Sequence, residues 1–183
     1  MKGCDEVIIW FIFFSVFEII SLMGFIKRND KILIKETLIS YFMISAFLLL
    51  TYLFNINIPK YMIILTLITI VGDTFLGNFL DLYNKSKTFD RYLHAFGAFS
   101  FSLLAYAVII AVTGQVINSI LFGAVLVFAC GMTLGAIFEI SEFISDKIKK
   151  TNHQHGLEDT DYDMIFDLIG SVIAAAFSAI FIF

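Results

Sequence analysis

The chain has 183 residues, of which 60% are hydrophobic and 22 are Phe. Soluble domains average about 45–50% apolar residues, and the excess here lies in long runs, so the composition excludes an ordinary soluble domain and indicates an integral membrane protein. The formal net charge of −4 argues against nucleic acid as a partner.

Six apolar runs are long enough to cross a bilayer as helices, which requires about 20 mostly apolar residues each. The fifth run is longer than a bilayer needs, so we expect it to tilt or to extend into the cytoplasm. The sequence therefore predicts an all-α fold, a single transmembrane domain over residues 1–183. The six predicted helices are residues 7–26, 37–58, 61–80, 92–112, 117–145 and 164–183.

The basic residues predict how these helices are oriented. Ten of the twelve Lys and Arg lie in three segments, residues 27–35, 85–91 and 147–150, which follow the first, third and fifth runs. Cytoplasmic loops of membrane proteins carry an excess of Lys and Arg. These three segments are therefore predicted to be cytoplasmic, with both termini outside.

The acidic residues of the runs gather near the predicted cytoplasmic face. Asp73 lies in the inner half of the third run. Glu139 and Glu142 lie in the inner part of the fifth run, and Asp163 and Asp167 open the last one. Their spacing places the acids of each helix on a single face. Carboxylates at this depth must be protonated, paired, hydrated or bound to a cation.

Simpler roles compete for some of the acids. Those near the start of the last helix fit N-caps and partners of the helix dipole; they are Asp159, Asp161 and Asp163. Those beside lysines at the membrane surface fit plain interfacial charges; they are Asp81, Asp90, Asp146 and Glu158. Function or obligatory pairing is favoured for Asp73, Glu139 and Asp167, which lie inside runs. Glu18, midway in the first run, has no partner that the sequence identifies.

Two basic side chains fall at the same predicted depth as these acids. His94, at the start of the fourth run, could bond a carboxylate, ligate a metal or relay a proton. Arg91 lies one turn before it and could hold an anion. His153 and His155, in the segment NHQH, are expected to be solvated loop residues.

Three motifs in the second half of the chain resemble a known family. They are FDRYLHAFGAF at 89–99, GAIFEISEFISD at 135–146 and DTDYDMIFDLIG at 159–170. Together they resemble small bacterial polytopic membrane proteins of the YjdF type, over residues 70–175 in preserved order. More remotely, the acidic pattern resembles VanZ-like proteins, which are associated with glycopeptide-antibiotic resistance. The resemblance implies a multi-pass protein of the bacterial cytoplasmic membrane.

The resemblance also implies which positions form the family signature. By motif they are Asp90, Arg91, His94, Glu139, Glu142, Asp159, Asp163 and Gly170. The chain departs from the YjdF pattern before Asp159, where NHQHGLE replaces a Gly-rich segment containing tryptophan. It departs from VanZ-like proteins in having Glu142 and Asp167 where Gln and Asn are typical.

The first functional hypothesis is cation-dependent handling of a lipid or lipid-linked substrate. Clustered carboxylates with one His suit Mg²⁺ or Mn²⁺, and such an ion could bridge substrate phosphates at the cytoplasmic leaflet. Arg91 is predicted to bind the substrate. The predicted catalytic residues are Asp73, His94, Glu139, Glu142, Asp163 and Asp167, and all of these except Asp73 are the predicted metal ligands.

Two alternatives use the same residues differently. A transporter for a cation or proton would use Asp73, Glu139 and Asp167 as a relay through the bundle. A non-catalytic membrane partner would use the acidic layer only to hold its helices together. In all three cases the expected surroundings are membrane lipid.

Overall fold

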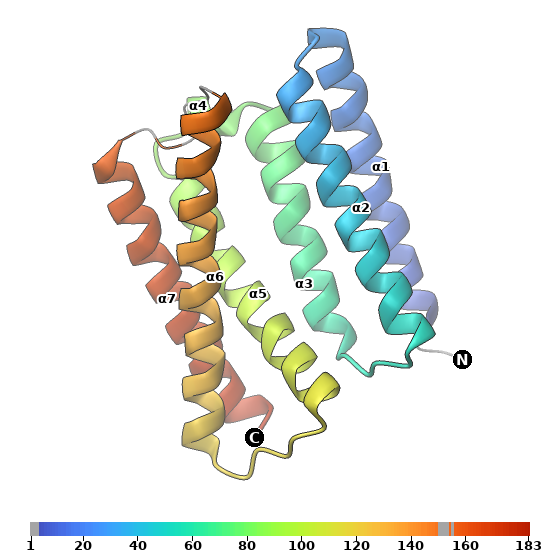
Figure 1. Ribbon diagram of the computed structural model, residues 1–183, viewed down its shortest axis with the longest axis vertical. Coiled ribbons are helices and arrows are strands. Elements are labelled where there is room, and N and C mark those ends of the chain that lie inside the picture. Colours follow the sequence, from blue (N-terminus) through green and yellow to red (C-terminus); the bar gives the residue numbers. More distant parts are fainter. Residues whose placement is uncertain (1–3, 150–153, 155) are drawn as a thin grey trace. The chain divides into compact units, whose positions relative to one another are not determined.

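Long apolar helices dominate the computed structural model, which describes residues 4–149, 154 and 156–183 (Figure 1). Within these residues, six helical segments are long and apolar enough to span a membrane, and no β-strand occurs. The predicted all-α fold is therefore confirmed. The elements are α1 (Cys4–Arg28), α2 (Lys31–Leu53), α3 (Lys60–Val71), the π-helix η1 (Gly72–Phe79), α4 (Leu82–Lys85), α5 (Phe89–Thr113), α6 (Ile120–Lys149) and α7 (Leu157–Phe181).

The chain divides into two compact units, Met1–Phe89 and Asp90–Phe183. In the first unit, α1 packs against α2, α3 and η1, and in the second unit α6 packs along α7. Aromatic rings also join α5 to α7, where Phe99 and Phe177 lie edge to face with centroids 5.8 Å apart. The single transmembrane domain and the orientation of the termini stay predictions.

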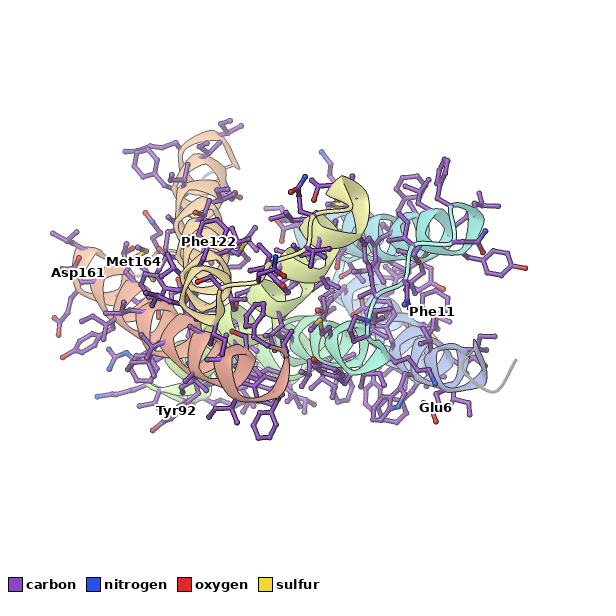
Figure 2. All side chains as sticks on the ribbon, turned by 90° about the horizontal axis from the view of Figure 1, so that it is seen from below. Glu6, Phe11, Tyr92, Phe122, Asp161 and Met164 are labelled. Carbon is purple, nitrogen blue, oxygen red and sulfur yellow. The ribbon has the colours of Figure 1, made fainter. Side chains whose placement is uncertain are left out.

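Apolar side chains surround the helices of both units (Figure 2). Phe42 of α2 is 72% exposed, and Phe122 of α6 is 59% exposed. Exposing so much apolar surface to water would be unfavourable, and soluble proteins rarely carry apolar patches of this size. Lipid chains remove that cost, so the surface agrees with six membrane-spanning helices.

Two helices begin six or seven residues earlier than the hydropathy of the sequence predicts. α2 begins at Lys31 rather than at residue 37, because Asp30 caps it and accepts hydrogen bonds from the backbone N–H groups of Ile32 and Leu33 at 3.2 and 3.1 Å. α7 begins at Leu157 rather than at residue 164. Acidic residues in its first turn complement the helix dipole, so polar residues extend this helix beyond its apolar part.

The third span changes from α-helix to π-helix at Gly72. The backbone N–H of Leu80 bonds the carbonyl of Phe75 at 2.9 Å, five residues back. Asp81 follows with a φ of 65°, which ends the span in a left-handed turn. The π-helix therefore sets how the side chains from Asp73 onward are turned.

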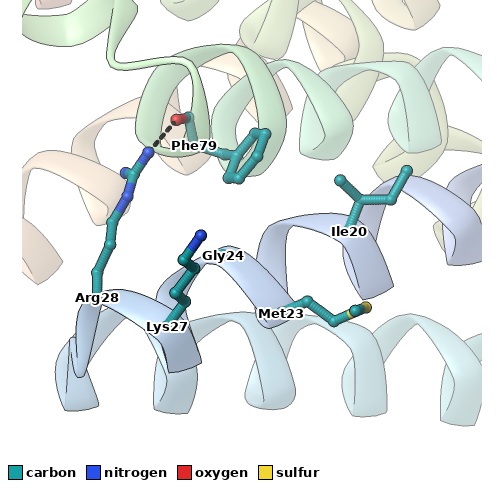
Figure 3. Close-up of a pocket in the computed structure, with 6 residues that line it drawn as sticks. All are labelled: Ile20, Met23, Gly24, Lys27, Arg28 and Phe79. Atoms are coloured by element: carbon teal, nitrogen blue, oxygen red, sulfur yellow. Dashed lines mark hydrogen bonds between the residues drawn. The ribbon is translucent and has the colours of Figure 1, made fainter.

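A groove of about 580 Å³ lies on the first unit where α1 meets η1 (Figure 3). In it, the Arg28 guanidinium donates a hydrogen bond to the carbonyl of Phe79 at 3.0 Å, which satisfies a backbone acceptor at the end of η1. Gly24 leaves room for the Phe79 ring, which a Cβ at that position would overlap. The groove thus marks a close approach of α1 and η1.

Candidate functional site

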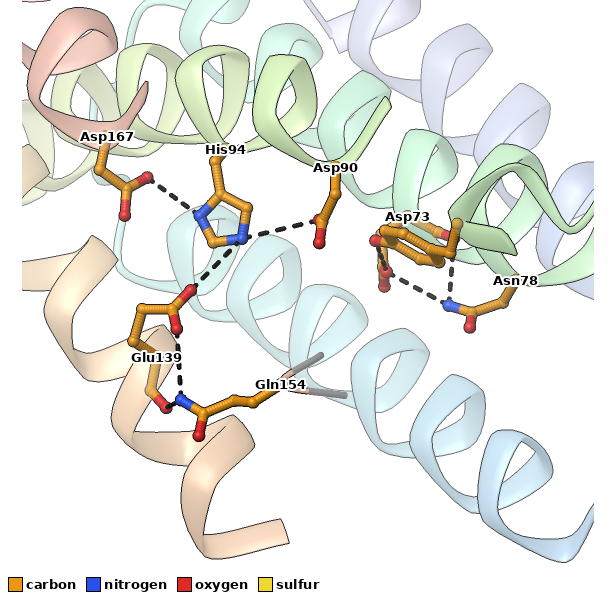
Figure 4. A network of polar contacts seen from close by, with 8 residues as sticks. Asp73, Asn78, Asp90, His94, Glu139, Gln154 and Asp167 are labelled. Carbon is orange, nitrogen blue, oxygen red and sulfur yellow. Dashed lines mark hydrogen bonds and ion pairs between the residues drawn. The ribbon is translucent and has the colours of Figure 1, made fainter. Parts of the chain in front are cut away.

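His94 is the centre of a polar network in the second unit (Figure 4). It lies in the second turn of α5 and is 7% exposed. Its Nδ1 lies 3.3 Å from Oδ1 of Asp167 on α7. Its Nε2 lies 3.6 Å from Oε1 of Glu139 on α6 and 3.7 Å from Oδ1 of Asp90, one turn earlier on α5. Three helices therefore bring carboxyl groups to one imidazole.

Two glycines of the second unit make this convergence possible. Gly170 of α7 lies against the backbone carbonyl of Ala95, the residue after His94, so α5 and α7 approach closely there. Gly135 of α6 lies under the Asp167 carboxylate, and a Cβ there would overlap Oδ2. Small residues at such contacts let membrane helices pack tightly, and here they set the distance from Asp167 to His94.

Gln154 fixes the Glu139 side chain from the connection between α6 and α7. Its side-chain amide donates to the backbone carbonyl of Glu139 at 3.2 Å and to Oε2 at 3.4 Å. Its backbone N–H donates to Oδ2 of Asp146 at 2.9 Å. The neighbouring His153 and His155 lie outside the described residues.

Asp163 and Glu142 complete the group of acids. Asp163 of α7 is 2% exposed and lies in the second turn, past the N-cap position. One ligand atom from each of Asp163, Asp90 and His94 lies within 4.8 Å of the others. Glu142 of α6 is half-buried and interacts electrostatically with all three.

Several buried oxygen atoms of this group have no hydrogen-bond partner among the described residues. They are Oε1 of Glu139, Oδ1 of Asp163 and Oδ2 of Asp167. An unsatisfied buried acceptor costs about 1–3 kcal/mol, and a charged one costs more. The arrangement therefore has the capacity to hold a positive species beyond the imidazole itself.

Arg91 lies three residues before His94 and stacks on an aromatic ring. Its guanidinium carbon is 3.7 Å from the centroid of the Tyr162 ring of α7. Its Nε is buried without a hydrogen-bond partner among the described residues. Guanidinium groups recognise phosphate and carboxylate oxygens, so the chemistry of Arg91 suits an anion.

The structure brings together most of the residues predicted for the site: His94, Glu139, Glu142, Asp163 and Asp167. Asp73 belongs to the first unit, where it accepts a hydrogen bond from Tyr83. Sequence reasoning favours an interfacial charge for Asp90 and misses Gln154. The i, i+4 spacing of Asp90 and His94 is the sequence signal that could have placed Asp90 in the site. Gln154 lies in a segment whose sequence shows no helical or apolar periodicity.

Comparisons with known proteins give a family and one distant relative. A family model described as "Predicted membrane protein (DUF2238)" matches residues 8–182. An uncharacterised protein of Thermotoga maritima is 35% identical over 96 residues, which are 52% of this chain. That match spans 50% of the relative's own length. No solved structure matches the chain. The more specific resemblances, to YjdF-type and VanZ-like proteins, stay predictions.

Proposed function

Because the chain belongs to this family of predicted membrane proteins, we propose that it is a multi-pass protein of the bacterial cytoplasmic membrane with a divalent-cation site at His94. The observation that carries the proposal is the convergence of carboxyl groups from three helices on one buried imidazole. The site would serve to bind the phosphate of a lipid or lipid-linked substrate.

The two nitrogens of His94 support a metal-ligating role. A metal-binding His usually donates its other ring N–H to a carboxylate, which fixes the tautomer. Asp167 is placed to accept from Nδ1 at 3.3 Å, and this leaves the lone pair of Nε2 toward Asp90 and Glu139. Ligand atoms about 2.1–2.2 Å from one ion, about 90–120° apart, are separated by about 3.0–3.8 Å. The 3.7 and 3.6 Å distances from Nε2 to Asp90 and Glu139 fall in that range.

The donor set favours Mn²⁺ over the other common divalent ions. Oxygen-rich sites suit Mg²⁺, Ca²⁺ and Mn²⁺, whereas imidazole suits transition metals. Oε1 of Glu139 and Oδ1 of Asp163, which have no hydrogen-bond partner within the described part of the chain, and Nε2 of His94 combine both kinds of ligand. We therefore place Mn²⁺ first and Mg²⁺ second.

A phosphate fits beside such an ion. A bound divalent ion polarises and neutralises phosphoryl oxygens. Arg91, on the same helix end as Asp90 and His94, offers guanidinium N–H groups to the remaining oxygens. A headgroup at the membrane surface would bring its phosphate to this depth while its acyl chains stay in lipid.

A structural role is the competing function, and one observation favours it. A protonated His94 would form ion pairs with Asp90, Glu139 and Asp167 at the observed distances and hold α5, α6 and α7 together. Such a layer would need no metal. A measurement of metal binding therefore distinguishes the structural role from the cation site.

The test is thermal unfolding of the purified full chain with Mn²⁺, Mg²⁺, Zn²⁺ or Ca²⁺. We expect saturable stabilisation that is strongest with Mn²⁺, because a ligand that binds only the folded state raises the unfolding temperature. Asp163→Asn should lose this stabilisation, and Asp161→Asn, which changes an exposed acid of the same helix, should keep it. If none of the four ions raises the unfolding temperature of the wild-type protein, or if Asp163→Asn is stabilised as much as the wild type, only the structural role remains.

The lipid arm uses nanodiscs of zwitterionic lipid with and without phosphatidic acid. We expect Mn²⁺-dependent enrichment of phosphatidic acid around the wild-type chain and a several-fold loss in Arg91→Gln. Arg91→Lys should lose most of it too, because Lys reproduces neither the stacking on Tyr162 nor the forked donors. Equal enrichment in all three chains would contradict the phosphate role.

A further inference from the structure

Glu18 is a buried acid in the middle of α1. It is 3% exposed, and neither of its carboxylate oxygens has a hydrogen-bond partner among the described residues. No basic side chain of the described residues forms an ion pair with it. Ser21, one turn along the same helix, is fully buried, and its hydroxyl also lacks such a partner. Two unsatisfied oxygen-bearing side chains thus lie together inside the first unit.

The π-helix η1 packs against this part of α1. The rings of Phe17 and Phe75 meet edge to face with centroids 4.7 Å apart. The side chain of Thr74 faces Glu18 and interacts with it, without the distance and angle of a hydrogen bond. The Asp73 carboxylate lies close enough to repel Glu18 electrostatically.

Asp73 is held in place by its own neighbours, as Figure 4 shows for Asn78. Its Oδ1 accepts a hydrogen bond from the Tyr83 hydroxyl at 2.6 Å and another from the Asn78 amide at 3.2 Å. Gly77 makes room for the Tyr83 ring, which a Cβ would overlap. The position of this second carboxylate is therefore determined by the π-helix and the turn that follows it.

Two neighbouring carboxyl groups within membrane-spanning segments, of which Glu18 is buried and Asp73 is partly buried, carry an electrostatic cost. A carboxylate without a partner is expensive in a membrane, and intramembrane acids commonly mark ion or proton sites. Two interacting carboxyls share protons or a cation rather than ionise independently. π-helical turns within α-helices are rare and are found frequently at functional sites. The Glu18 oxygens, which lack a hydrogen-bond partner in the part of the chain that the structure describes, and the irregular helix point independently to a bound species.

We propose that the first unit binds one small monovalent cation between the carboxyl groups of Glu18 and Asp73. The hydroxyl groups of Ser21 and Thr74 are the neutral oxygen ligands on either side. All four groups offer oxygen, which suits a hard alkali ion such as Na⁺ and also a shared proton. This site is independent of His94 and makes the first unit sensitive to ion composition.

The experiment measures thermal unfolding of the full chain in buffer whose only cation other than the proton is choline, with NaCl, KCl or LiCl added. For an alkali ion we expect saturable stabilisation that is selective for Na⁺ or Li⁺ over choline. Glu18→Gln should abolish it. Glu6→Gln should retain it, because Glu6 is an exposed acid of the same helix, paired with Lys60 at 3.0 Å.

The proton arm uses infrared difference spectroscopy of the same samples from about pH 5 to about pH 10. A carboxylic acid C=O band that titrates reversibly and is missing in Glu18→Gln identifies the cation as a proton. If Glu18→Gln does not fold, Thr74→Val replaces it, because it removes a neutral ligand and keeps both charges. Thr74→Val should raise the Na⁺ concentration needed for half-maximal stabilisation several-fold, or shift the infrared C=O band of the carboxylic acid.

The proposal is overturned if no alkali ion stabilises the protein selectively and no titrating band depends on Glu18 or Thr74. The result is separable from the metal site of the second unit. Mn²⁺ stabilisation should be the same in Glu18→Gln and wild type, and Na⁺ stabilisation should survive in Asp163→Asn. Loss of both responses in either variant would show that the two sites are not independent.

Discussion

Gly170 of α7 lies directly against the backbone carbonyl of Ala95 of α5, with no room for a Cβ between them. Ala95 follows His94, and Gly170 comes three residues after Asp167, so the closest approach of the two helices is also where the imidazole meets its carboxylate. The spacing of α5 and α7 and the geometry of the His94 network therefore depend on one another.

Gly170→Ala should destabilise the protein and disturb the network together. Ala normally favours a helix over Gly by about 1 kcal/mol, but overpacking costs about 1–3 kcal/mol, and a backbone oxygen cannot rotate away. We expect a lower thermal unfolding midpoint in detergent and a weaker response to Mn²⁺. Val172→Ala, at a position that is 51% exposed on the same helix, is the control. Equal midpoints in the two variants would contradict the close contact.

Asp167→Asn tests the hydrogen bond to Nδ1 of His94. The amide keeps an oxygen that can accept from Nδ1–H, but it lacks the charge that makes the imidazole a stronger ligand. Partners of this kind change metal affinity about 10–100-fold. We expect a drop of that size in Mn²⁺ affinity, measured by electron paramagnetic resonance titration, with the chain still folded. An unchanged affinity would remove Asp167 from any role in metal binding.

Gln154→Ala tests whether the connection between α6 and α7 holds Glu139. The change removes two hydrogen bonds to Glu139, and a typical hydrogen bond contributes about 0.5–1.5 kcal/mol. We expect the free energy of unfolding to fall by about that much, with faster hydrogen exchange near the end of α6. Gln115→Ala, at an exposed position between α5 and α6, should have no effect. A double-mutant cycle with Glu139→Gln should show coupling, and strict additivity would rule the contact out.

Tyr83→Phe and Gly77→Ala test the support of Asp73. The phenylalanine keeps the ring contact with Phe89 at 5.5 Å and removes the 2.6 Å hydrogen bond to Asp73, a kind of bond that contributes about 1.5–3 kcal/mol when charged and buried. Asp73 is only partly buried, so we expect the free energy of unfolding to fall by the lower end of that range, about 1.5 kcal/mol. Gly77→Ala should cost more, because it also displaces the ring. The reverse order of unfolding midpoints would contradict this packing.

The long spans can be predicted from hydropathy because apolar runs of bilayer length rarely form anything except membrane-spanning helices. The proximity of His94 and Asp167 can also be predicted, since the run boundaries place them in one layer although they are 73 residues apart in sequence. Hydropathy identifies the part of a helix that lies in lipid and not its first residue. The predicted start of the last helix is therefore late, and α7 begins at Leu157, where polar residues extend it.

Asp90 and η1 could not be predicted from the same signals. Asp90 precedes the apolar part of its helix, so its proximity to His94 depends on α5 starting at Phe89. The π-helix at Gly72–Phe79 is a backbone feature that apolar periodicity does not encode. Thr74, which interacts with Glu18, lies in this irregular segment, so the apolar periodicity of the sequence does not identify it as a neighbour of Glu18.

The π-helix also has a consequence for insertions and deletions in this family. A π-helical segment accommodates one more residue than the α-helix would in the same length. Deleting one residue between Gly72 and Phe79 would let this segment close as a regular α-helix, so the residues that follow would keep nearly the same orientation relative to the preceding helix. The apolar length of the span would hardly change. Single-residue insertions and deletions should therefore be better tolerated in this segment than elsewhere in the long helices.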